Sequence, residues 1–146
     1  MMLAAHGAAR SWAYPVHAIL LAFPIALFTA GLITDIAYVK TAHVQWTNFS
    51  SWLIAGALVF GGIVGAWAIV DLIVGWRGAW RRRAAAYVIV LAVMWILGLV
   101  NAFHHTHDGW SSVGAAGVIL SVLTALLALI AGWIAYSAAT AREIVR

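Results

Sequence analysis

The stretch NAFHHTHDGW places three histidines and an aspartate side by side in a chain that has few polar groups. If the preceding helix continues through it, Asn101 and His105 share one face at a spacing of four, and so do His104 and Asp108. Imidazole and carboxylate groups at that spacing suit zinc, copper or iron. Two other interpretations stay open: a polar helix end in the wet interface, with Asp108 capping the next helix, or an edge that docks a partner.

A second aspartate, Asp35, is expected at the depth of these histidines. His17 precedes Asp35 by eighteen residues, which is about 27 Å along a helix, so the two cannot share one site. We therefore expect Asp35, His104, His105 and Asp108 to be the candidate metal ligands.

At the opposite end, His17 and Asp71 are expected at similar depths. An ionised carboxylate is costly in lipid, so we expect a His17–Asp71 pair; the alternative is that both side chains reach water. A haem b held by two histidines needs both at one depth on facing elements, and the sequence does not decide between the combinations. The candidate cofactor-binding residues are therefore His17, Asp71, Asn101 and His105, with haem b or a transition metal as cofactor.

The composition identifies the solvent of the chain. Of its 146 residues, 66% are hydrophobic and 8% are charged, and the mean hydropathy is +1.02. A soluble domain of this size could not bury that much apolar surface, so a lipid bilayer is the expected environment. The absence of cysteine excludes disulfides and thiolate metal sites.

Four apolar runs are each long enough for a membrane-spanning helix of about 20 residues. They cover approximately residues 16–39, 51–75, 84–103 and 112–138. Short connections make neighbouring helices antiparallel. We predict an all-α, integral membrane four-helix antiparallel bundle that forms a single domain over residues 1–146.

The basic residues predict the orientation. Lys40 alone lies on one side of the predicted membrane. Seven arginines lie on the other side: Arg10, Arg77, Arg81, Arg82, Arg83, Arg142 and Arg146. By the positive-inside rule both termini are cytoplasmic, in the cell inner membrane of a bacterium. Because these charges sit at segment ends, the net charge of +4 does not indicate nucleic-acid binding.

The first helix carries its polar groups on one stripe, which should face the bundle. Two interleaved series at a spacing of seven form this stripe: His17, Pro24 and Gly31, and Leu21, Phe28 and Asp35. In the second run Gly61 and Gly65 form a small face for close helix approach, and Ser121 and Thr124 belong to a small, weakly polar stripe of the fourth run.

Two motifs resemble a family catalogued as domain of unknown function twenty-two thirty-one. The stretch YPVHAILLAFPIALFTAGLITDIAY matches its opening at Pro15, His17, Phe23, Pro24, Ile25, Ala26, Leu27 and Asp35. The stretch VNAFHHTHDGWSS matches a motif of one branch at Asn101, Ala102, Phe103, His105, Asp108 and Gly109. The resemblance implies a small bacterial four-helix membrane protein. The domain occurs joined to c-type cytochrome modules in some proteins, which implies a membrane redox system.

We expect a non-enzymatic integral membrane subunit associated with electron transfer, which binds haem b or a metal through histidines. One alternative is a small oligomeric transporter or channel with Asp35 and Asp71 along its path; another is a structural or assembly subunit of a larger complex. The expected partners are the bilayer and other membrane subunits or further copies of the chain. An enzyme is not expected, because the sequence offers no nucleophile–base pair, phosphate-binding loop or paired catalytic carboxylates.

Overall fold

The computed structural model describes the backbone of residues 2–74, 79–106 and 113–144, and the side chains of 15–74, 81–106 and 113–137. The described residues form four helices: α1 (Met2–Thr41), α2 (Val44–Val74), α3 (Ala79–Thr106) and α4 (Ala115–Ile144). There is no strand among them. The expected all-α class is confirmed.

All four helices are long and apolar enough to cross a membrane, over Pro15–Thr41, Val44–Val74, Arg81–Thr106 and Ala115–Ser137. Large apolar side chains cover the outside of the bundle, among them Trp52, Ile73 and Trp133, each about three-quarters exposed. Such a surface suits a lipid environment, because exposing this much apolar area to water would be unfavourable.

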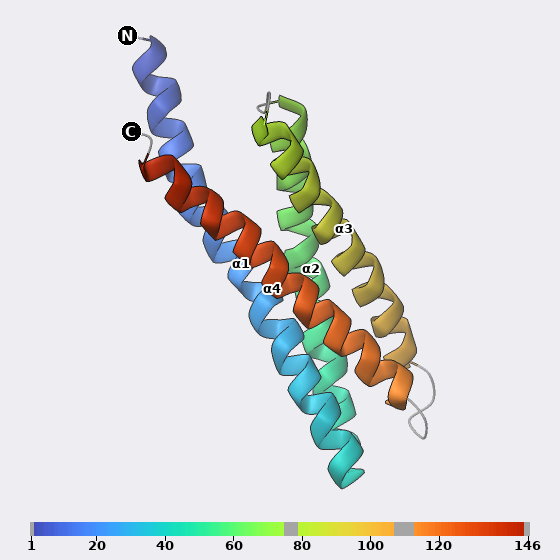
Figure 1. Ribbon diagram of the computed structural model, residues 1–146. Coiled ribbons are helices and arrows are strands. Elements are labelled where there is room, and N and C mark those ends of the chain that lie inside the picture. The colour runs from blue at the N-terminus through green and yellow to red at the C-terminus, as the bar shows by residue number, and fades with distance from the viewer. Residues whose placement is uncertain (1, 75–78, 107–112, 145–146) are drawn as a thin grey trace.

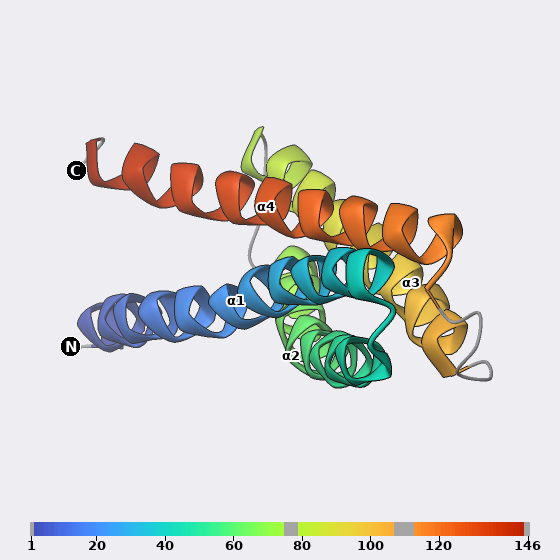
Figure 2. The same ribbon diagram turned by 90° about the horizontal axis from the view of Figure 1, so that it is seen from below.

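The helices run up and down in chain order (Figure 1). Each packs against its neighbours in the chain, and α4 returns to α1, so α1 faces α3 diagonally across the bundle. The chain termini, the end of α2 and the start of α3 lie at one end, here called the terminal end; the opposite end is called the distal end. Toward the terminal end, the α1–α4 pair diverges from the α2–α3 pair (Figures 1 and 2).

Alternating spacings of three and four decide which residues face the bundle axis. The buried residues of α2 follow this spacing without a break: Thr47, Ser50, Ile54, Ala57, Gly61, Val64 and Ala68. A seven-residue repeat of this kind keeps one face of a helix toward its partners, as in left-handed helical bundles.

The stripe of α1 predicted to face the bundle does so. Leu21, Pro24, Phe28, Gly31 and Asp35 are all buried, and His17 is half-buried. Since α1 has an unbroken inward face on both sides of Pro24, the proline is accommodated within a packed helix rather than ending it.

The centre of the bundle is an apolar layer. Leu21, Phe28, Val64, Leu91 and Met94 are each at most 2% exposed and belong to one core cluster. This layer separates the polar groups at the two ends of the bundle.

Close packing in this layer depends on glycine. A Cβ added at Gly98 would lie 2.8 Å from Phe28 Cζ, and one at Gly61 would lie 3.3 Å from Met94 Cε. One at Gly65 would meet no atom within 4 Å. The predicted close approach of the second helix to its neighbours is therefore found at Gly61, whereas Gly65 makes no such contact.

The first connection is shorter than expected, because α2 begins at Val44 rather than near residue 51. Ala42 adopts a left-handed conformation with φ 53°, and its N–H donates to the carbonyl of Tyr38 at 2.7 Å. This bond ends α1 in the manner of a helix C-terminal cap. The Trp46 N–H donates to the His43 carbonyl at 3.1 Å, so the next helix starts at once.

Candidate functional site

Five buried polar side chains meet near the distal end of the bundle, and all four helices contribute. They are Asp35 of α1, Ser50 of α2, Asn101 and His105 of α3, and Ser121 of α4, here called the Asp35 cluster. Thr41, the last residue of α1, follows Asp35 by six residues, about 9 Å along the helix. The cluster therefore lies inside the apolar span but nearer to the distal end than to the centre.

Asp35 is the acceptor on which the cluster converges. His105 Nε2 lies 2.9 Å from Asp35 Oδ1. The Ser50 hydroxyl donates to the same oxygen, and the Ser121 hydroxyl donates to Oδ2. Both carboxyl oxygens are thus bound by side chains from the other three helices.

A second set of hydrogen bonds orients these groups. Asn101 Nδ2 donates to Ser121 Oγ at 2.8 Å, which leaves the Ser121 proton free to point at Asp35. His105 Nδ1 lies 2.9 Å from the backbone carbonyl of Asn101, one turn earlier on α3. Ser50 Oγ also lies 3.2 Å from His105 Nε2, so this hydroxyl contacts both members of the Asp35–His105 pair.

These contacts determine how many protons the pair holds. A carbonyl oxygen only accepts, so the contact with Asn101 O requires a proton on His105 Nδ1. If Nε2 and Asp35 Oδ1 both lacked a proton, two lone pairs would face each other at 2.9 Å. The geometry therefore favours one proton between these two atoms, on either the imidazole or the carboxyl group.

In both placements the pair is neutral overall. This neutrality suits the site, because an isolated carboxylate away from water has a desolvation cost of several kcal/mol. It also means that loss of the shared proton would leave one uncompensated negative charge in the membrane-spanning part of the bundle.

Two buried polar atoms in this region have no hydrogen-bond partner among the described residues. One is Asn101 Oδ1, an amide acceptor, and the other is Thr47 Oγ1, one turn distal to Ser50 on α2. Both residues are at least nine-tenths buried. Because a buried polar atom normally has a partner, each of these two atoms has capacity for a further hydrogen bond.

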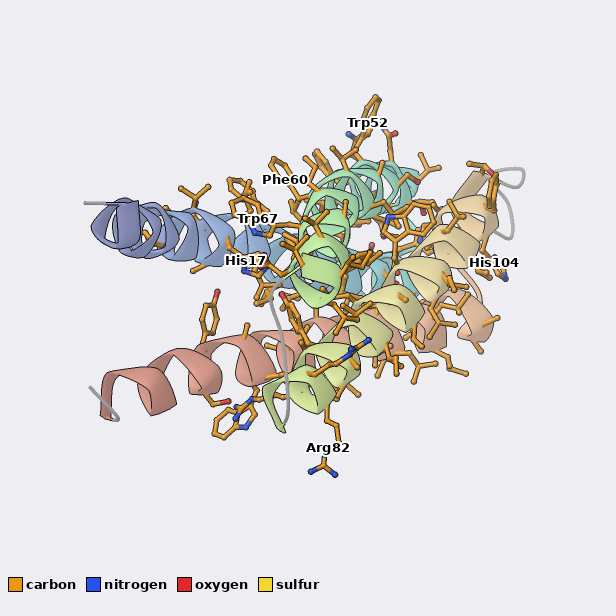
Figure 3. The ribbon with its side chains drawn as sticks, turned by 90° about the horizontal axis from the view of Figure 1, so that it is seen from above. His17, Trp52, Phe60, Trp67, Arg82 and His104 are labelled. Atoms are coloured by element: carbon orange, nitrogen blue, oxygen red, sulfur yellow. The ribbon has the colours of Figure 1, made fainter. Side chains whose placement is uncertain are left out.

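At the terminal end the structure does not bring His17 and Asp71 to ion-pair distance. Asp71 is exposed, and the one salt bridge among the described side chains joins Asp35 to His105. His17 instead lies beside Trp67, with ring centroids 5.7 Å apart, and beside Tyr87 at 5.9 Å (Figure 3). The His17 ring thus makes an edge-to-face contact with Trp67.

The candidate metal ligands are not brought together as a set. Asp35 and His105 are in contact, His104 is half-buried at the end of α3 (Figure 3), and Asp108 lies outside the described residues. Within the described part of the chain, no three side chains of the metal-binding types converge.

His105, as it lies in the cluster, also does not fit a haem ligand. Both ring nitrogens of His105 are engaged, one with Asn101 and one with Asp35, so no lone pair faces an open position. His17 is separated from His105 by the apolar layer. We therefore derive no step through haem or a transition metal.

Sequence analysis identified Asp35, Asn101 and His105 but did not name Ser50, which directly precedes the second apolar run at residues 51–75. The signal was present: the spacing Thr47, Ser50, Ile54 continues the inward face of α2. Ser121 was read as a packing residue, since nothing in a single sequence shows that its hydroxyl meets a carboxylate 86 positions earlier.

Comparison with known proteins gives one result. Residues 13–144 match a family model described as "Predicted membrane protein (DUF2231)". No curated protein matches the chain, and no solved structure does.

Proposed function

This chain belongs to the DUF2231 family of predicted membrane proteins, and from that premise we propose that it is a non-enzymatic membrane subunit that takes up and releases one proton at the Asp35–His105 pair. One observation carries the proposal: His105 Nε2 and Asp35 Oδ1 lie 2.9 Å apart, with both side chains buried inside the membrane-spanning part of the bundle. Ionisable groups inside membranes are typical of proton-handling sites.

In this proposal the Asp35–His105 pair exchanges its proton with only one side of the membrane. Asp35 is about 9 Å from the distal end of α1, whereas the apolar layer of Leu21, Phe28 and Met94 lies between it and the terminal end. In this proposal a proton therefore reaches the pair from the distal side. We take that side to face outward from the cell inner membrane, with both termini cytoplasmic, as the positive-inside rule predicts.

The physiological setting that we propose is a membrane electron-transfer system, in which redox steps at one face of the membrane release or consume protons. In this setting the chain handles the proton and a partner subunit carries the electron. The support is the resemblance to a family whose domain occurs beside cytochrome modules, together with the buried contact between Asp35 and His105.

Infrared difference spectroscopy of the full-length protein in detergent tests the proton site directly. Spectra recorded at acid and alkaline pH should contain carboxyl and imidazole bands that disappear in Asp35→Asn and persist in Asp71→Asn, the matched change at an exposed aspartate. Identical spectra for wild type and Asp35→Asn would overturn the proposal.

The alternative of a transporter or channel predicts a different result. Proteoliposomes that contain the protein should dissipate a pH gradient no faster than empty vesicles if exchange is one-sided. A proton flux that is lost in Asp35→Asn would contradict the one-sided site and favour a conducting path.

The electron-transfer partner has its own test. Purification in a mild detergent should give a complex with haem absorbance, and transfer to a harsher detergent should leave the chain colourless, because both ring nitrogens of His105 are already engaged within the chain. Haem that remains with the isolated chain would count against the proposal that a partner subunit, and not this chain, carries the electron.

A further inference from the structure

We propose that Arg83 and Ser137, at the terminal end of the bundle, bind the phosphate group of an anionic phospholipid. Arg81 and Arg82, the neighbours of Arg83 in the chain, add positive charge to this site. The proposal does not depend on the proton pair at the other end of the bundle. It is carried by the contacts of Arg83, by the charge around it and by its depth in the membrane.

Contacts with α4 hold the Arg83 side chain between α3 and α4. Its Nη2 donates to Ser137 Oγ at 2.6 Å and lies 3.5 Å from the carbonyl of Ile134. A guanidinium group has several N–H donors in a planar fork, and among the described residues Nη2 alone makes hydrogen bonds. The half-buried side chain is therefore positioned by α4 and keeps donors that fit the oxygens of a phosphate.

The positive charge around Arg83 has no counter-ion among the described side chains. Arg81 and Arg82 are exposed, and the first turn of α3 carries no acidic residue. The start of a helix already has a partial positive charge, so adjacent cations there are unfavourable. Asp71, the described carboxylate at this end, is exposed and forms no salt bridge with a described arginine, and the side chain of Glu143 lies outside the described residues. An anion from outside the chain would compensate this charge.

The depth of the site identifies a lipid as the carrier of the phosphate. Arg83 directly precedes the apolar run of residues 84–103, and Ser137 is the last residue of the membrane-spanning part of α4. Both therefore lie where the hydrocarbon layer meets the headgroups, which carry phosphate. Trp133, one turn before Ser137 and about three-quarters exposed, supplies apolar surface for acyl chains beside the site. A zwitterionic headgroup carries its own cation, so an anionic lipid fits this charge better.

The same arginines are also the topology signal, which needs positive charge but no particular geometry. The contact of Arg83 with α4 goes beyond that requirement. Arg82 provides the contrast, because its side chain points away from the bundle (Figure 3). A specific site predicts that Arg83 contributes more to lipid binding than Arg82, whereas diffuse attraction predicts equal contributions.

Native mass spectrometry of the full-length protein, released from detergent with added lipid, tests the site. The probes are phosphatidylglycerol and phosphatidylcholine with the same acyl chains. The first molecule of phosphatidylglycerol should bind each chain at a clearly lower concentration than the first molecule of phosphatidylcholine. Excess inorganic phosphate should not displace it, because a free ion lacks the acyl chains that hold the headgroup at this depth.

Matched variants locate the binding. Arg83→Gln removes a charge-assisted hydrogen bond and should weaken binding of phosphatidylglycerol about tenfold or more. Arg83→Lys keeps the charge without the planar fork and should have an intermediate effect. Arg82→Gln should weaken binding about fivefold or less, as expected for a basic residue that only adds to the surface charge. Lys40→Gln removes an exposed positive charge at the distal end and should have no effect.

Three results would overturn the proposal. Equal binding of the two lipids would remove the preference for an anionic headgroup. Displacement of phosphatidylglycerol by inorganic phosphate would indicate a site for a free ion. Equal losses in Arg83→Gln and Arg82→Gln would indicate diffuse attraction. If Arg83→Gln does not fold, Ser137→Ala tests the site with every charge kept: it should weaken binding of phosphatidylglycerol, and unchanged binding would count against the proposal.

Discussion

Asp35 and His105 are 70 positions apart in the sequence and lie on α1 and α3, which face each other diagonally, yet their side chains meet at 2.9 Å. The contact spans the bundle axis, and Ser50 and Ser121 reach it from the two remaining helices. A polar group from each helix thus meets at one point, so the relative register of all four helices is tied to one carboxyl group.

The first prediction concerns the stability of this pair. Removing one partner leaves the other buried without its counterpart, so Asp35→Ala and His105→Ala should each lower the free energy of unfolding by about 3–5 kcal/mol. The double variant should cost much less than the sum of the two. A double-mutant cycle from denaturation in detergent measures the difference, and additive effects would contradict the pairing.

The second prediction separates Ser50 from its neighbour. Ser50→Ala removes a hydroxyl that touches both Asp35 and His105 and should cost about 1–3 kcal/mol. It should also shift the imidazole bands in the infrared spectrum. Ser51→Ala removes a hydroxyl that donates to the Thr47 carbonyl of its own helix, so its cost should stay below about 0.5 kcal/mol. Equal effects of the two changes would argue against the bridging role of Ser50.

The third prediction tests the packing of the apolar layer. In Gly98→Ala the new methyl group would lie 2.8 Å from Phe28 Cζ and 3.1 Å from Leu58 Cδ2, and we expect a loss of about 1–3 kcal/mol. Gly65→Ala meets nothing within 4 Å, so it should be neutral or stabilise the helix by up to about 1 kcal/mol. Thermal denaturation of both variants in one detergent measures the contrast, and the reverse order would contradict this arrangement of α1 and α3.

The fourth prediction is the orientation in the membrane. Because the chain contains no cysteine, a single introduced cysteine is an unambiguous label site. Lys40→Cys, at the distal end, should react with a membrane-impermeant maleimide in intact cells with a permeable outer envelope. Arg82→Cys, whose side chain points away from the bundle near the start of α3 (Figure 3), should react after the inner membrane is opened. The opposite labelling pattern would reverse the proposed side of proton exchange.

The sequence predicted the fold because its main determinants are local. Apolar runs of about 20 residues require helices in lipid, since each backbone group must then be satisfied within its own segment. The seven-residue stripe of α1 predicted which face is buried, and Leu21, Phe28 and Asp35 lie there. The start of α2 was placed too late, because the polar residues Thr47 and Ser50 obscured a helix that begins at Val44.

Sequence alone determined that Asp35 and His105 lie at one depth, since depth follows from counting residues along a helix at about 1.5 Å each. Tertiary structure decided everything that depends on rotation and register between helices. It turned His105 toward the axis while His104, one residue earlier, stays half-exposed. It gave Asp35 two serine donors, and it placed an aromatic contact at His17 where an ion pair with Asp71 was expected. The physical reason is that depth is a property of one helix, whereas contact is a property of how four helices pack together.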